Sequence, residues 1–187
     1  MWSTEQQPFI MGILVSVIVG IALTIPISSA AICAALSLTG LAGGAAVAGC
    51  CAQMIGFAVM SFPENKFGGL ISQGLGTSML QVPNIVRKPI IWLPAIVSSA
   101  ILAPVSTMLL KMVSNPVGSG MGSAGLVGQF MSYDTMVAAG VSPVTVLLEI
   151  IVMHFILPAV VSLAIAEAMR KMGLIKNGDL KLEAANA

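Results

Sequence analysis

The sequence predicts an all-α, polytopic integral membrane protein, and two observations support that prediction. Of its 187 residues, 57% are hydrophobic and only 8% are charged, whereas soluble domains carry about 25% charged residues. In addition, no Asp, Glu, Lys, Arg or His occurs between Gln7 and Glu64. A single soluble core of this size could not bury so long an uncharged stretch, so we expect hydrocarbon to surround it.

Four apolar stretches are long enough to cross a bilayer core of about 30 Å, which takes roughly 20 helical residues. We expect about four spans, at Pro8–Ile25, Ser28–Met60, Pro89–Leu110 and Val144–Met169. The second stretch is too long for one span and is rich in glycine, so a tilted, broken or re-entrant helix is expected there. Within it, Gly40 and Gly44 form a Gly-x-x-x-Gly pattern, which favours close helix packing.

The Lys and Arg residues determine the expected orientation. Four of them follow the last span, which predicts that residues 170–187 form a short cytoplasmic tail. If residues 111–143 do not cross the membrane, residues 61–88 and the N-terminus are cytoplasmic as well. The net charge of +1 gives no reason to expect a nucleic acid as partner.

Two glycine-rich segments, Gly68–Val86 and Asn115–Gln129, lie between the expected spans. Their glycines and prolines disfavour uninterrupted helices. Non-helical backbone at membrane depth is tolerated only where it is buried in protein or lines a water-filled cavity. We therefore favour two re-entrant or broken-helix segments that line a polar cavity; the alternative is a pair of interfacial connectors. The residues that we select here as solute contacts are Gln73, Thr77, Gln81, Asn84, Asn115, Gly118, Gly120, Gly122, Ser123 and Gln129.

Part of the second segment, Gly120–Gly125, has the glycine spacing of a dinucleotide-binding loop. That spacing is meaningful only between a strand and a helix, with an acidic residue about 20 positions later. Pro116 interrupts the preceding residues and Asp134 comes too early, so no nucleotide site is expected. We expect these glycines to allow close backbone approach and to leave peptide groups free to face a polar solute.

Glu149 and His154 are the only ionisable residues well inside an expected span. Such groups are costly in a membrane and mark functional sites by default. On a regular helix they diverge by about 140°, but Pro158 cannot donate to the carbonyl of His154 and so allows distortion. The alternative is a core histidine and a glutamate that reaches surface water. Tyr133 and Asp134 are candidates for the mouth of the cavity.

Catalysis by this chain alone is poorly supported. It has one histidine, no pair of carboxylates at a useful spacing and no cluster of metal ligands, so we expect no catalytic residues, metal or cofactor. Its three cysteines lie in the apolar run, where packing is the expected role. A permeation pathway fits this pattern better than an enzyme does.

Four long segments carry a family resemblance: LTIPISSAAICAALSLTGLAGGAAVAGCCAQMIGFAV, GGLISQGLGTSMLQVPNI, NPVGSGMGSAGLVGQF and HFILPAVVSLAIAEAMRKMGLIKNGDLKL. The chain resembles enzyme IIC-like membrane permeases of the bacterial phosphoenolpyruvate-dependent sugar phosphotransferase system, including the perfringolysin-regulator type. The resemblance covers nearly the whole chain and is to the C-terminal half of proteins about twice this length. It implies that residues 1–187 are one transmembrane domain, half of a permease, which forms a homo-oligomer or assembles with an N-terminal half.

The resemblance also implies a function. A IIC subunit of the bacterial plasma membrane binds and translocates a sugar or similar small polar solute, while separate IIB and IIA components supply the phosphoryl group. In better-studied IIC proteins a glutamate and a histidine near re-entrant loops bind sugar hydroxyls, roles that would correspond to Glu149 and His154. Two alternatives remain: a membrane-bound sensor that binds solute without transport, and a channel-like or structural assembly module.

Overall fold

The computed structural model describes residues 2–182, which contain helices and no strand. The all-α prediction is therefore confirmed. Three continuous helices are long and apolar enough to cross a membrane, and they comprise Gly40–Met60, Pro89–Leu109 and Pro143–Lys171. The first expected span corresponds to a shorter apolar helix, Pro8–Thr24.

Short π- and 3-10 helices interrupt or join the α-helices. The α-helices are α1 (Trp2–Gln6), α2 (Pro8–Thr24), α3 (Ser29–Ala35), α4 (Gly40–Met60), α5 (Phe62–Ile71), α6 (Val82–Arg87), α7 (Leu93–Pro104), α8 (Pro116–Ser119), α9 (Val127–Ala138), α10 (Pro143–Ile150) and α11 (Leu157–Lys171). The π-helices are η1 (Ser72–Gly76), η4 (Val105–Leu109) and η6 (Ile151–Ile156), and the 3-10 helices are η2 (Ser78–Gln81), η3 (Pro89–Trp92) and η5 (Ala124–Leu126).

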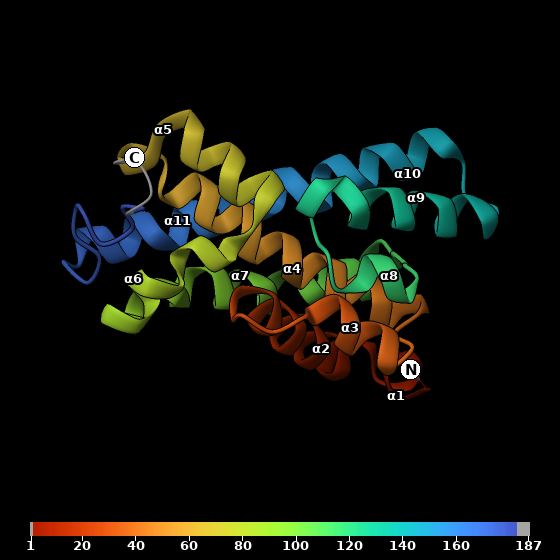
Figure 1. Ribbon diagram of the computed structural model, residues 1–187. Coiled ribbons are helices and arrows are strands. Elements are labelled where there is room, and N and C mark those ends of the chain that lie inside the picture. Colours follow the sequence, from red (N-terminus) through yellow and green to blue (C-terminus); the bar gives the residue numbers. More distant parts are fainter. Residues whose placement is uncertain (1, 183–187) are drawn as a thin grey trace.

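Helix α4 forms the centre of the bundle and packs against α2, α7 and α11 (Figure 1). Almost every residue of α4 is buried. Small residues make this possible, because a Cβ at Gly44 would collide with the Met112 carbonyl, and one at Gly49 with the Ser16 carbonyl. Close approach therefore occurs at Gly44, whereas Gly40 begins the helix with a φ of +61°.

The long second apolar stretch is broken, as the sequence predicted. Helix α3 begins after Ser28, whose hydroxyl accepts a hydrogen bond from the Ala31 N–H, and ends at Ala35. Ser37 then adopts a φ of +49°, which turns the chain before α4 begins. Only α4 of this stretch is long enough to span a membrane.

The last apolar stretch is continuous but distorted. Helices α10 and α11 are joined by the π-helix η6, which ends two residues before Pro158. Proline has no N–H to donate to the carbonyl four residues earlier, which belongs to His154. A π-bulge next to proline changes the angular spacing of side chains on either side of it. The distortion predicted from Pro158 is thus present at His154.

A buried polar network crosses the bundle at Gln53 of α4, whose side chain is fully buried. Its Oε1 accepts hydrogen bonds from Trp92 Nε1 at 2.8 Å and from Thr24 Oγ1 at 3.3 Å. Its Nε2 donates to Ser99 Oγ at 3.4 Å. One glutamine therefore ties together α2, α4, η3 and α7.

The described ends of the chain lie at opposite ends of the bundle (Figure 1). Helices α9 and α10 form an antiparallel pair that extends from the end of the bundle opposite α5 and α6. The residues after α11 fold back beside α5 and α6 and bury Ile175 and Leu180 in the core there. The predicted tail is therefore a docked segment as far as Leu182.

Candidate functional site

The second glycine-rich segment packs tightly on the bundle. Asn115 caps α8 by accepting a hydrogen bond from the Gly118 N–H at 3.0 Å. Gly120 lies against the backbone of Ser29, whose hydroxyl donates to the Gly120 carbonyl at 2.7 Å. Gly122 has a φ of +54° and lies against Cys50 of α4. These glycines serve close approach between chain segments, as the sequence suggested.

Two buried polar residues meet at the end of this segment. Gln129, in the first turn of α9, places its Nε2 3.3 Å from His154 Nδ1 in η6 and 3.4 Å from Cys51 Sγ in α4. His154 is fully buried and Gln129 is 7% exposed. Among residues 2–182, neither Gln129 Oε1 nor His154 Nε2 has a hydrogen-bond partner. The pair thus has two unused polar atoms in the interior.

A cavity of about 450 Å³ lies next to Gln129, and the neighbour of His154 in sequence, Phe155, also lines it. Gln129 forms part of its wall, together with Leu126, Phe130, Tyr133, Asp134, Leu147, Ile150 and Phe155. The wall thus combines three aromatic rings with one amide and one carboxylate, a mixture typical of small-molecule sites. We name this space the α9–α10 cavity. Tyr133 and Asp134 lie in its wall, where the sequence had suggested a cavity mouth.

Glu149 and His154 do not form a pair. Glu149 lies half-buried on α10, and one of its carboxylate oxygens has no hydrogen-bond partner among the described residues. Its neighbours in sequence, Leu147 and Leu148, are both exposed. The hydrogen bond of His154 is to Gln129, so the two predicted ionisable residues lie in different surroundings.

The first glycine-rich segment is a broken helix that runs through η1 and η2 into α6. Its three amides form a buried chain, in which Gln81 Nε2 donates to Gln73 Oε1 and Asn84 Nδ2 donates to Gln81 Oε1, both at 2.8 Å. Gln73 Nε2 also donates to Ser61 Oγ at 2.8 Å. Thr77 accepts from the Met79 N–H and caps η2. The protein itself therefore supplies hydrogen-bond partners for these amides.

Ser123 joins the two glycine-rich segments. Its hydroxyl donates to the Gly74 carbonyl in η1 at 2.6 Å. A second, apolar cavity of about 410 Å³ has Gly74 and Phe155 in its wall, and Phe155 also lines the α9–α10 cavity. Two connected groups of predicted contacts thus emerge, one around Gln73 and Gln81 and the other around Gln129 and His154, whereas Glu149, Asn115 and Gly120 belong to neither.

Two of the three aromatic residues in the cavity wall, Phe130 and Phe155, were not selected from the sequence. Phe130 and Asp134 are four residues apart on α9, as are Gln129 and Tyr133, so all four lie on one side of that helix. This spacing is a signal that the sequence contains. Phe155 had no such signal, because its position depends on the π-helix.

Comparison with protein families gives one match that spans almost the whole chain. The family model described as "Phosphotransferase system, EIIC" matches residues 1–182. Searches of curated proteins and of solved structures gave no match. The chain belongs to the phosphotransferase-system EIIC family, which supports a general role as a sugar permease of that system and a location in the membrane.

Proposed function

We propose that this EIIC-family chain binds a sugar or similar small polar solute in the α9–α10 cavity and translocates it, while a separate IIB partner phosphorylates it. The observation that supports this is the pair of unused polar atoms, Gln129 Oε1 and His154 Nε2, beside an aromatic-lined cavity. Leaving a buried polar atom without a partner costs about 1–3 kcal/mol. A bound hydroxyl would remove that cost.

The chemistry of the pair suits a sugar. If Gln129 Nε2 donates to His154 Nδ1, the proton of the neutral imidazole is on Nε2. The pair then offers one acceptor, Gln129 Oε1, and one donor, His154 Nε2. Both atoms are buried behind the cavity wall, so the two side chains must turn toward the cavity for a solute to reach them. A sugar hydroxyl donates and accepts, so adjacent hydroxyls can then satisfy both atoms. The rings of Phe130, Tyr133 and Phe155 would cover the apolar face of the sugar.

Binding tests this proposal directly. The purified chain in lipid nanodiscs would be titrated calorimetrically with glucose, galactose, mannose, N-acetylglucosamine and mannitol. Gln129→Leu should weaken binding of the sugar that binds by about tenfold or more, since it removes one buried hydrogen bond and leaves His154 without its partner. Lys171→Gln, at an exposed position on α11, is the matched control and should bind as the parent does. Equal binding by the parent and Gln129→Leu would show that the solute lies elsewhere.

Transport requires a second measurement. Proteoliposomes that contain the chain, with phosphorylated IIB component on the side that corresponds to the cytoplasm, would be assayed for uptake of the radiolabelled sugar that binds. Saturable uptake that falls in Gln129→Leu supports a permease. Binding without uptake would instead identify a membrane-bound sensor, and the permease proposal would be wrong.

We also infer that residues 170–187 face the cytoplasm of a bacterial cell. The support is the cluster of Lys and Arg after α11. Amine-reactive labelling should therefore reach exposed Lys176 in inside-out membrane vesicles and not in intact cells. Labelling in intact cells would reverse the orientation.

A further inference from the structure

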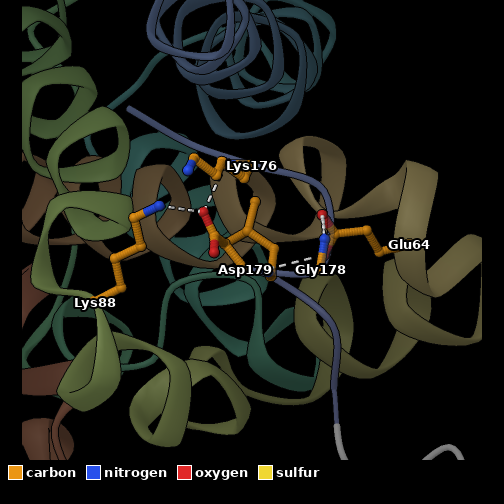
Figure 2. Close-up of polar contacts among 6 residues, drawn as sticks. Glu64, Lys88, Lys176, Gly178 and Asp179 are labelled. Atoms are coloured by element: carbon orange, nitrogen blue, oxygen red, sulfur yellow. Dashed lines mark hydrogen bonds and ion pairs between the residues drawn. The ribbon is translucent and has the colours of Figure 1, made fainter. Parts of the chain in front are cut away.

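Residues 176–182, which we name the strap, lie across the first turn of α5 (Figure 2). The two carboxylate oxygens of Glu64 accept hydrogen bonds from the Gly178 and Leu180 N–H groups, at 3.0 and 2.9 Å. Asn65 donates to the Leu180 carbonyl at 2.8 Å and accepts from the Leu182 N–H at 2.9 Å. Two adjacent side chains of α5 thus hold the backbone of the strap.

An ion pair fixes the strap on its other side. Lys88 Nζ, just after α6, is 2.6 Å from Asp179 Oδ2, which also accepts from the Lys176 N–H at 2.6 Å (Figure 2). Leu180 is fully buried in an apolar cluster with Met60 and Ile91. Leu180 is therefore the apolar anchor of the strap, and the polar contacts determine its position along α5 and α6.

The strap also determines how a buried amide is oriented. Gln81 Nε2 has two hydrogens, and it donates to the Leu180 carbonyl at 3.0 Å and to Gln73 Oε1 at 2.8 Å. Asn84 Nδ2 bridges Gln81 Oε1 and the Lys181 carbonyl in the same way. Gln81 is fully buried while the strap is docked. If the strap leaves, Gln81 Nε2 loses the Leu180 carbonyl as an acceptor, and that contact no longer holds the amide in its orientation toward Gln73.

Gln73 is connected to the α9–α10 cavity through its neighbour Gly74. Gln73 lies in η1, a single-turn π-helix, an element that is rare and that occurs frequently at functional sites. The next residue, Gly74, accepts the hydrogen bond of Ser123, which leads through η5 to Gln129. A continuous series of contacts therefore runs from the Leu180 carbonyl through Gln81, Gln73 and Ser123 to the cavity.

We propose that the strap is a clasp that positions η1 through Gln81, so that docking of the strap sets the solute affinity of the α9–α10 cavity. The effect on affinity rests on the proposed function; the coupling between the strap and the cavity does not. Gln81 is a positioning residue in this scheme, since it acts through Gln73 and touches no solute.

Hydrogen exchange of the solute-free chain in nanodiscs tests the coupling. Asp179→Ala loosens the strap, whereas Gln81→Met leaves the contacts of Glu64, Asn65 and Lys88 with the strap in place and removes its link to Gln73. Both variants should raise exchange by about tenfold in residues 72–82 and also in residues 121–129. Lys171→Gln should change neither. The conservative variant Lys88→Arg, which keeps a cation beside Asp179 and leaves the Lys176 N–H bond in place, should keep protection in both segments.

The outcomes separate the two proposals. If Asp179→Ala raises exchange only in residues 176–182, or Gln81→Met leaves residues 121–129 unchanged, the clasp proposal is wrong. If exchange spreads to residues 121–129 but no sugar of the panel binds, the coupling stands and the proposed function fails. Should either variant unfold, the milder variant Asp179→Asn, which keeps the shape of the side chain, is measured instead. The same criterion applies: the proposal is wrong if exchange rises only in residues 176–182. For the sugar that binds, Gln81→Met should lower affinity severalfold, and unchanged affinity would refute regulation by the strap.

Discussion

Replacing Gln53 by methionine should destabilise the whole bundle, because this one side chain joins four elements. Methionine keeps the length and apolar stem of glutamine and removes all three hydrogen bonds. Thr24 and Ser99 retain other partners, Ser78 for the first and the Gly49 and Ala95 carbonyls for the second. Trp92 Nε1 has no other partner recorded among the described residues.

The size of the destabilisation depends on whether each partner of Gln53 keeps another hydrogen bond. The two bonds whose partners have alternatives contribute about 0.6 kcal/mol each, the average for side-chain bonds in membrane helices. The half-buried Trp92 N–H adds about 1–2 kcal/mol, the lower part of the range for an unsatisfied donor. The free energy of unfolding should therefore fall by about 2–3 kcal/mol.

The protein contains its own reporters for this measurement. Cys33, Cys50 and Cys51 are free thiols with no exposed surface, so a thiol-reactive fluorophore labels the chain only as it unfolds. Unfolding would be followed during titration with sodium dodecyl sulfate in mixed micelles. Ser98→Ala is the control, because Ser98 Oγ is buried one residue from Ser99 and has no partner among the described residues. If Gln53→Met were as stable as Ser98→Ala, the network would contribute nothing and the reasoning would be refuted.

Two further predictions use the same preparation. Gly49→Ala should lower the free energy of unfolding by about 1–3 kcal/mol, because the new methyl group meets the Ser16 carbonyl. Gly68→Ala is the control and should not lower it, since there is open space around Gly68. Equal free energies of unfolding for the two variants would contradict the close approach of α2 and α4. Burial raises the pKa of Asp179, but hydrogen bonds from Lys88 and the Lys176 N–H and the charges of both lysines outweigh it and hold that pKa below its usual value of 3.8. The stability that Asp179 gives the strap is thus complete above the usual pKa and is lost as the pH falls through the lower folded pKa. Hydrogen exchange of residues 176–182 should show this loss, and Asp179→Asn should make it smaller without removing it, because the Glu64 carboxylate also holds the strap.

The sequence determined the features that depend on local chemistry. Hydrophobicity sums along the chain, so the apolar stretches and their approximate limits could be found without knowing the fold. Glycine and proline act on the backbone where they stand, so the breaks at Ser72–Gly76 and at Pro116–Leu126 and the distortion before Pro158 were predictable. Whether these broken segments re-enter the bilayer stays a prediction.

The tertiary structure decided which polar groups meet, because a side chain's type does not determine its partner. Gln73, Gln81 and Gln129 look alike in sequence, as uncharged amides in glycine-rich segments. The fold brings Gln81 to Leu180, far along the chain, and so satisfies the first two amides, whereas it brings Gln129 to His154 and leaves two atoms unused. Composition determined that the chain folds in a membrane, since transfer free energy adds residue by residue. Only long-range packing could determine where an unpaired hydrogen-bonding atom remains for a solute.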